Sequence, residues 1–92
     1  MSSDRIRRRL VVRGQVQGVF FRDSTRRRAD SLGVAGWAAN RADGAVEVVL
    51  EGPPDAVERV AEFARRGPSR ARVDSVDDSE EEPEGLTGFT VR

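Results

Sequence analysis

The segment GQVQGVFFR, from Gly14 to Arg22, combines two glycines, small and amide side chains, and an arginine. A loop of this composition can turn its main-chain N–H groups inward around an anion, because glycine lets the backbone approach a ligand closely. The guanidinium of Arg22 can bind two oxygens of the same anion. The segment therefore predicts a phosphate-binding loop. The alternative is that both glycines only reverse the chain and that Arg22 is a solvated surface residue.

A second polar side chain that could serve the same site is Asn40, at the end of GWAAN and just before Asp43. Asparagine is also a common turn residue whose side chain bonds nearby backbone, so that interpretation stays open. Trp37 is expected to be a packing residue, and Thr25 a helix residue that faces the loop. No lysine followed by Ser or Thr comes after Gly18, which argues against the loop of a nucleotide triphosphatase.

Composition narrows the classes of function. The 92 residues, 37% of them hydrophobic, predict one domain, residues 1–92, with a single modest core. Sixteen basic and sixteen acidic residues give no net charge that would attract nucleic acid or an anionic membrane. Without cysteine or histidine, we expect no disulfide, no transition-metal site and no cofactor. The N-terminal MSSDRIRRRL has no apolar run, so we expect a cytoplasmic protein without a signal peptide.

The elements on either side of the loop must position it. Residues 7–13 carry β-branched residues and no breaker before Gly14, which predicts a first strand. After the loop, apolar or small residues recur at helical spacing at Phe21, Thr25, Ala29 and Leu32. Gly33 is expected to end this helix. Arg22 therefore lies in the first turn of the helix.

Two extended segments, residues 34–41 and 45–51, flank the turn signal Asp43-Gly44 and predict a β-hairpin. A second helix is expected to open at Pro53-Pro54 and to end at Gly67, since proline suits a first turn. Its apolar stripe consists of Val57, Val60, Ala61 and Ala64.

The C-terminal part is less regular. Residues 71–76, ARVDSV, predict a strand, and the spacing of Val73 and Val76 indicates a bulge or an early end. The acidic stretch 77–85, DDSEEEPEG, is expected to be an exposed loop. Residues 88–92 predict a last strand. The early arginines and these late acidic residues are expected to attract one another.

The resulting order is β-α-β-β-α-β, with the option of a further short strand. It predicts an α+β, ferredoxin-like split βαβ sandwich, with an antiparallel sheet and two helices on one face. This fold hosts many functions, so the chemistry must come from the site.

Together, GQVQGVFFR, GWAAN and DGAVEVVLEG resemble the acylphosphatase family, with both family signatures in order and a match over essentially the whole chain. The resemblance implies an enzyme that hydrolyses the carboxyl–phosphate bond of acyl phosphates. It implies that the phosphoryl oxygens are held by main-chain N–H groups of Gly14, Gln15, Val16, Gln17, Gly18, Val19 and Phe20. It further implies that Arg22 anchors the same group, that Asn40 positions the attacking water and that Thr25 could support the loop.

This reaction can proceed without histidine. The leaving carboxylate ordinarily has a pKa of roughly 4, so it needs no general acid at neutral pH. The remaining tasks are positioning and charge compensation, and we expect the bound phosphate itself to accept the proton of the water. We therefore expect a metal-independent enzyme with a small-molecule acyl phosphate substrate. We also expect a monomer that binds neither nucleic acid nor membrane.

Three alternatives remain. Ferredoxin-like sheets can bind RNA, but the aromatic content of 5% and the different helical directions of residues 26–28 disfavour this. Acylphosphatase-like domains also occur in larger carbamoyl-transferring maturation proteins, and this sequence lacks the zinc-binding cysteines expected there. A regulatory relative with a vestigial site is disfavoured because the loop, Arg22 and Asn40 are all present.

Overall fold

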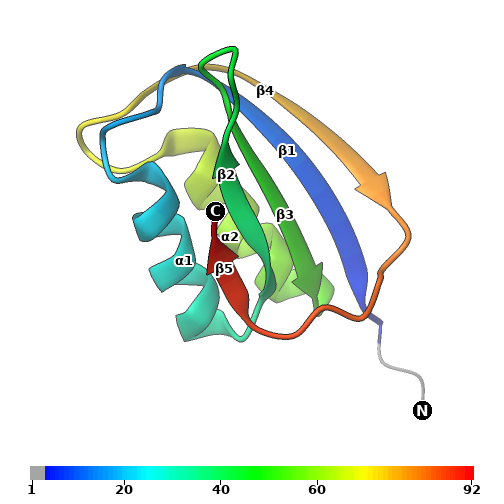
Figure 1. Cartoon of the computed structure of the whole chain (residues 1–92). Helices are drawn as coiled ribbons and strands as arrows, with labels where there is room; N and C mark the ends of the chain where they lie inside the picture. Colours follow the sequence, from blue (N-terminus) through cyan, green and yellow to red (C-terminus); the bar gives the residue numbers. More distant parts are fainter. Residues whose placement is uncertain (1–3) are drawn as a thin grey trace.

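The computed structural model describes residues 4–92 and packs a five-stranded sheet against two helices (Figure 1). Residues 1–3, the start of the stretch that argues against a signal peptide, lie outside the described residues. The elements are β1 (Ile6–Gln15), α1 (Phe21–Leu32), β2 (Ala35–Asn40), β3 (Val46–Gly52), α2 (Pro54–Arg66), β4 (Arg72–Glu81) and β5 (Phe89–Val91). Both helices and the β2–β3 hairpin lie where the sequence predicts them.

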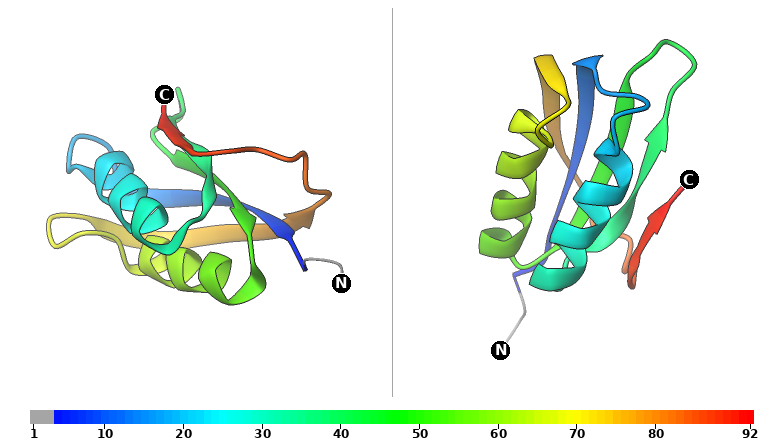
Figure 2. Two further views of the ribbon diagram at one scale, coloured as in Figure 1. Left: turned by 90° about the horizontal axis from the view of Figure 1, so that it is seen from below. Right: turned by 90° about the vertical axis from the view of Figure 1, so that its left-hand side faces the viewer.

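The strand order in the sheet is β4-β1-β3-β2-β5. Neighbouring strands from β4 to β2 are antiparallel, as predicted, whereas β5 pairs in parallel with β2 and makes the sheet mixed. Both helices cover the same face (Figure 2). The predicted ferredoxin-like arrangement is therefore confirmed, and the described chain adds the short parallel strand β5 at the edge next to β2.

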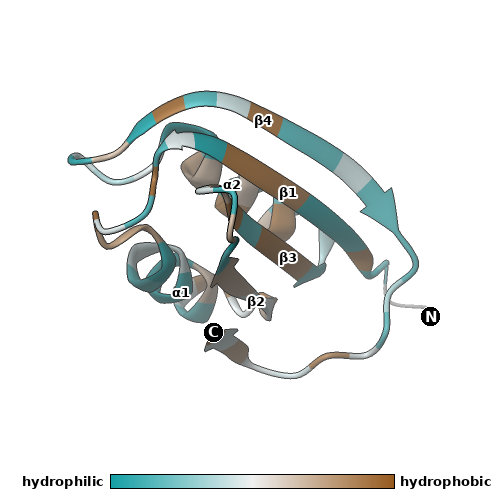
Figure 3. Cartoon of the chain, turned by 45° about the horizontal axis from the view of Figure 1, so that its top comes forward, coloured by the Kyte–Doolittle hydropathy of each residue, from teal (hydrophilic) through white to brown (hydrophobic). Residues whose placement is uncertain are grey.

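The hydrophobic core lies between the helices and the sheet. The central strands β1 and β3 carry its most hydrophobic stretches, whereas β4 is mostly hydrophilic (Figure 3). The fully buried side chains include Leu10, Val12, Phe21, Val46, Val48, Leu50, Val57 and Val60. Leu32 is only half-buried against this core. Asn40 follows the buried Ala38 by two residues, so strand alternation directs it to the same helix-covered face.

The acidic stretch corrects the prediction made from sequence. Residues 77–81 are not a loop but the second half of β4, which pairs with β1 along its whole length. The arginines of β1 hold them there, because Arg8 Nε donates to Asp78 at 2.9 Å and Arg7 Nε donates to Glu81 at 2.8 Å. The expected attraction between early arginines and late acids is thus present. It orders a strand that has little hydrophobic alternation of its own.

The bulge predicted in β4 is confirmed, and the alternative of an early end is wrong. Arg13 pairs with Ser75 but Gly14 pairs with Val73, so Asp74 is the extra residue. Gly14 has a φ of +135°, and a β-carbon there would lie 2.1 Å from the carbonyl oxygen of Arg72. Gly14 is therefore required for the close approach of the two strands.

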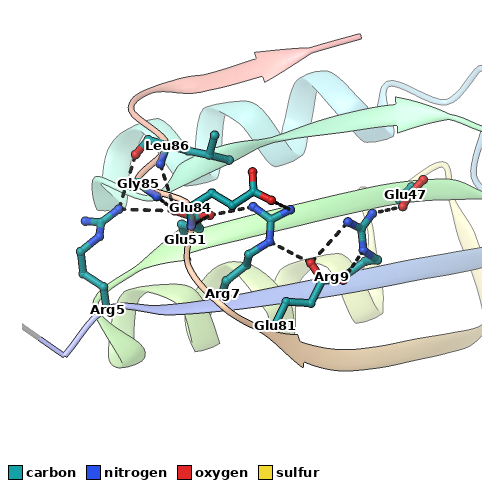
Figure 4. Close-up of polar contacts among 9 residues, drawn as sticks. All are labelled: Arg5, Arg7, Arg9, Glu47, Glu51, Glu81, Glu84, Gly85 and Leu86. Atoms are coloured by element: carbon teal, nitrogen blue, oxygen red, sulfur yellow. Dashed lines mark hydrogen bonds and ion pairs between the residues drawn. The ribbon is translucent and has the colours of Figure 1, made fainter.

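The sheet face without helices is covered by ion pairs instead (Figure 4). We call this group the ion-pair network, and its members are Arg5, Arg7, Arg9, Glu47, Glu51, Glu81 and Glu84. At its centre, Arg7 Nη1 donates to Glu51 at 2.6 Å, and the two side chains are 4% and 0% exposed. Glu51 also accepts the main-chain N–H groups of residues 84–86. It therefore fixes the connection that leads from β4 to β5.

Candidate active site

The loop between β1 and α1 is held at both sides. The side chain of Val16 is buried in the core. Gln17 Nε2 donates to the carbonyl oxygens of Arg41 and Ala45 at 2.8 and 2.9 Å, which ties the loop to the β2–β3 turn. Val19 packs against the core from the other end of the loop. The side chain of Gln17 thus has a structural task, and its main-chain N–H stays available.

Main-chain N–H groups are the chemical feature of this loop. Within residues 4–92, none of the N–H groups of residues 16–23 donates a hydrogen bond to another described residue. The first bond of the helix runs from Ser24 N to Phe20 O at 3.0 Å. Gly18 and Phe20 have φ angles of +75° and +63°, which bend the chain sharply before α1. Unpaired N–H groups and the positive end of a helix dipole together favour an anion.

These groups border a pocket of about 250 Å³. Its lining residues are Val16, Gly18, Phe20, Phe21, Arg22, Asp23, Asn40 and Val91. The structure therefore brings Arg22, from the first turn of α1, to the same pocket as Asn40, from the end of β2. This volume lies just below the ~300–1,000 Å³ common for drug-sized ligands, so the pocket suits a small molecule.

Several predicted residues lie elsewhere. Gly14 and Gln15 belong to β1, pair with β4 and do not line the pocket. Thr25 is fully buried, and its Oγ1 donates to the carbonyl oxygen of Phe21 at 2.8 Å. This hydrogen bond stabilises the first turn of α1 on its buried side. Trp37 packs on the sheet face that the helices do not cover. The guanidinium carbon of Arg92 lies over its ring, 4.2 Å from the ring centroid.

The guanidinium of Arg22 is held by the last strand. Its Nη1 donates to the main-chain oxygen of Arg92 at 2.5 Å. Arg92 is placed in turn by its N–H, which donates to Ala38 O at 2.8 Å. Strand β5, which pairs with β2, thus brings Val91 to the pocket and places the next residue, Arg92, against Arg22. The position of Arg22 therefore depends on the edge of the sheet as well as on α1.

The sequence comparison decides the family. A sequence model of acylphosphatases matches residues 8–91. This chain belongs to the acylphosphatase family. It is 54% identical over 86 residues to an acylphosphatase of Rubrobacter xylanophilus, covering 91% of this chain and 77% of that relative. It is 47% identical over 90 residues to one of Natronomonas pharaonis, covering 98% of both.

A solved structure agrees. An acylphosphatase from Coxiella burnetii superposes with a TM-score of 0.90 at 38% identity, over 96% of this chain and 93% of that one. The resemblance inferred from the two signatures is thereby confirmed, and membership of the family supports an acylphosphatase activity and a small-molecule acyl phosphate substrate.

Sequence reasoning missed two residues that line the pocket of this acylphosphatase family member and one group that contacts Arg22. Asp23 and Val91 line it, and the main-chain oxygen of Arg92 contacts Arg22. Asp23 carried a signal, since it stands next to Arg22 in the first helical turn. Val91 and Arg92 carried none, because only the placement of β5 beside β2 brings them there.

Two further features of the described residues concern membranes and metals. Across residues 4–92, no helix is long and apolar enough to cross a membrane. In the same range, no group of three or more Asp, Glu, His or Cys side chains is arranged to hold a metal ion. The one acidic side chain at the pocket, Asp23, pairs with Arg26 and Arg27 at 2.9 and 3.1 Å.

Proposed function

We propose that this protein hydrolyses the carboxyl–phosphate bond of acyl phosphates and releases a carboxylate and inorganic phosphate. The observation that carries the proposal is the convergence of three kinds of group on one pocket. These are the unpaired N–H groups of the loop, the guanidinium of Arg22 and the carboxamide of Asn40. Each is suited to one part of the reaction.

The phosphoryl group is bound by the loop and Arg22. In this proposal the N–H groups of residues 16–20 donate to its oxygens, and Arg22 adds a charge-assisted hydrogen bond. The start of α1 contributes its positive dipole end. The Gln17 side chain keeps the loop in place through the β2–β3 turn. Gly14 and Gln15, which lie in β1, contribute through the geometry of the loop entrance.

The attacking water is oriented by Asn40. The water oxygen forms a bond to phosphorus while the bond from phosphorus to the carboxyl oxygen breaks, and the leaving group departs as a carboxylate. Because asparagine is a poor base, a phosphoryl oxygen accepts the proton of the water. Neither a general acid nor a metal ion is required by this scheme, since the departing carboxylate is stable without a proton at neutral pH.

Substitutions of Arg22 and Asn40 test this division of tasks. In Arg22→Ala we expect kcat/KM for benzoyl phosphate to fall about 100- to 1,000-fold, as for the loss of one preorganised donor. In Asn40→Ala we expect a fall in kcat with an inhibition constant for inorganic phosphate close to that of the wild type. Arg59→Ala, an exposed arginine on α2, is the matched control and should leave both values unchanged.

The assay is run with and without EDTA. Equal rates are expected, and loss of activity with EDTA would refute metal independence. A fully active Arg22→Ala variant would refute the site, and weak inhibition of Asn40→Ala by phosphate would refute the proposed role of Asn40. A monomeric, cytoplasmic protein that binds neither nucleic acid nor membrane stays a prediction from composition.

A further inference from the structure

Phe20 is exposed at the edge of the candidate site. Within residues 4–92 it is the one large hydrophobic residue that is strongly exposed, with 69% of its surface accessible. It immediately precedes α1 and lines the same pocket as Arg22 and Asn40. Exposure of a phenyl ring forgoes the stabilisation that burial would give. A functional contact of the ring would account for its position.

The backbone of Phe20 supports this interpretation. Its φ and ψ angles of 63° and 25° place it in the left-handed region, which glycine or asparagine adopts far more readily than a bulky residue. The neighbouring Phe21 shows the contrast, since it has ordinary helical geometry and its ring is buried in the core. In this left-handed conformation the Phe20 side chain stays outside the core and lines the pocket.

The pocket has a polar part and an apolar part. Arg22, Asn40 and the N–H group of Gly18 form the polar part, which in the proposed function takes the phosphoryl group. The apolar lining consists of Val16, Phe20, Phe21 and Val91. Val16 and Phe21 are buried in the core, so Phe20 from the loop and Val91 from β5 are its more accessible members. An acyl phosphate bound through its phosphoryl oxygens must extend its acyl group along the remaining, apolar lining. The chemistry of the two parts therefore matches the two ends of one substrate.

Resting on the proposed function, we infer that Phe20 and Val91 form a subsite for the acyl group, and that the preferred substrates carry uncharged aromatic or branched aliphatic acyl groups. The phenyl ring of Phe20 supplies a face for stacking or edge contact. Val91 supplies a smaller apolar surface from β5. A second carboxylate on the acyl group would lose hydration against these apolar side chains without gaining a charged partner from them, so such an acyl group is disfavoured.

The test compares acyl groups on a common phosphoryl group. Values of kcat/KM are measured for benzoyl phosphate, acetyl phosphate and succinyl phosphate with wild type, Phe20→Ala and Phe20→Asn. Asparagine tolerates the left-handed conformation, so the second variant keeps the loop geometry if alanine disturbs it. Any effect on phosphoryl binding acts on all three substrates, so the ratio of benzoyl to acetyl phosphate isolates the acyl subsite.

We expect the wild type to prefer benzoyl over acetyl phosphate and succinyl phosphate to be the poorest substrate. In both Phe20 variants the benzoyl-to-acetyl ratio should fall about 3- to 10-fold, the size of one aromatic contact. Val91→Ala should move the ratio in the same direction by less. Phe63→Ala removes a half-buried ring on α2, outside the pocket lining, and should leave the ratio unchanged.

The outcomes separate the two proposals. A wild-type protein that hydrolyses none of the three substrates would overturn the proposed function itself. Hydrolysis with an unchanged ratio in both Phe20 variants would overturn the acyl subsite and leave the proposed function standing. A wild type that prefers succinyl phosphate would also overturn it, because the subsite would then bind a charged acyl group.

Discussion

Replacing Glu51 by alanine would remove the central acceptor of the ion-pair network. The Glu51 carboxylate is fully buried and accepts four hydrogen bonds, from Arg7 Nη1 at 2.6 Å and from the main-chain N–H groups of residues 84–86 at 2.9–3.1 Å. Burial acts to raise the pKa of Glu51, but the N–H of Glu84 and the guanidinium of Arg7 outweigh it and lower the pKa. The carboxylate is therefore charged in the folded protein at neutral pH.

The expected loss of stability is large. Without Glu51, the guanidinium of Arg7 stays 4% exposed with one close partner fewer, and three main-chain donors lose their acceptor. Breaking a buried pair costs about 3–5 kcal/mol, which for a domain of this size lowers the melting temperature by roughly 12–40 °C. The control is Glu47→Ala, since Glu47 pairs with Arg9 on the same face while 21% exposed. Its loss should cost about 1 kcal/mol or less.

Urea denaturation of wild type, Glu51→Ala and Glu47→Ala measures both free energies of unfolding. The double variant Arg7→Met/Glu51→Leu should recover the part of the loss that comes from the unpaired Arg7 charge, because it removes both buried charges. The N–H groups of residues 84–86 still lack their acceptor in this variant, so the recovery should be incomplete. Equal losses in Glu51→Ala and Glu47→Ala would refute the reasoning, since water would then be replacing the Glu51 carboxylate without penalty. Where Glu51→Ala is still folded, its kcat/KM should fall more than that of Glu47→Ala, because residues 84–86 lead to β5.

Two further predictions concern pH. Side-chain hydrogen bonds from Arg9 and Arg7 lower the pKa of Glu81 to about 2 in the folded protein, compared with about 4.5 in the unfolded chain. The contribution of Glu81 to the free energy of unfolding is therefore complete above about pH 4.5 and is lost as the pH falls toward 2. The urea concentration at the midpoint of unfolding should stay constant from pH 7 to about pH 5 and then decrease. A midpoint that stayed constant down to pH 2 would contradict this prediction. The sequence has no His, Cys, Tyr or Lys, so kcat for benzoyl phosphate should be flat from about pH 5 to 9, apart from titration of the substrate. A protein pKa near 7 in kcat would show that a group outside the proposed site takes part.

The elements that the sequence predicts well are those with a strong local signal. Helix α1 shows helical spacing and ends at Gly33, whose φ of +69° strongly favours glycine. Helix α2 opens with proline and presents a regular apolar stripe. The β2–β3 turn is fixed by Asp43, whose Oδ1 accepts the N–H of Ala45 at 3.1 Å. In each case the decisive interaction lies within a few residues along the chain.

The second half of β4 shows why an acidic stretch can form a strand without a sequence signal for one. Its side chains are polar on both faces of the sheet, so no alternation of hydrophobic and polar residues marks it as a strand. Asp78 faces the helices, where its carboxylate accepts hydrogen bonds from Arg8 at 2.9 Å and from Arg65 of α2 at 2.7 Å. A carboxylate in this position is recognisable only once the partner arginines are known to be adjacent, which the sheet order determines.

The candidate site also has a part that the local sequence predicts and a part that depends on the sheet. Arg22, Asn40 and the loop belong to two short signatures, and the sequence names them. The oxygen that holds Arg22 belongs to Arg92, at the end of a strand whose approach is fixed by residues 84–86 and therefore by Glu51. The ion-pair network on one face of the sheet thus influences the position of the Arg22 guanidinium on the helix-covered face. A chain that kept both signatures but lost the buried Arg7–Glu51 pair would keep every residue of the proposed chemistry and still orient Arg22 less well.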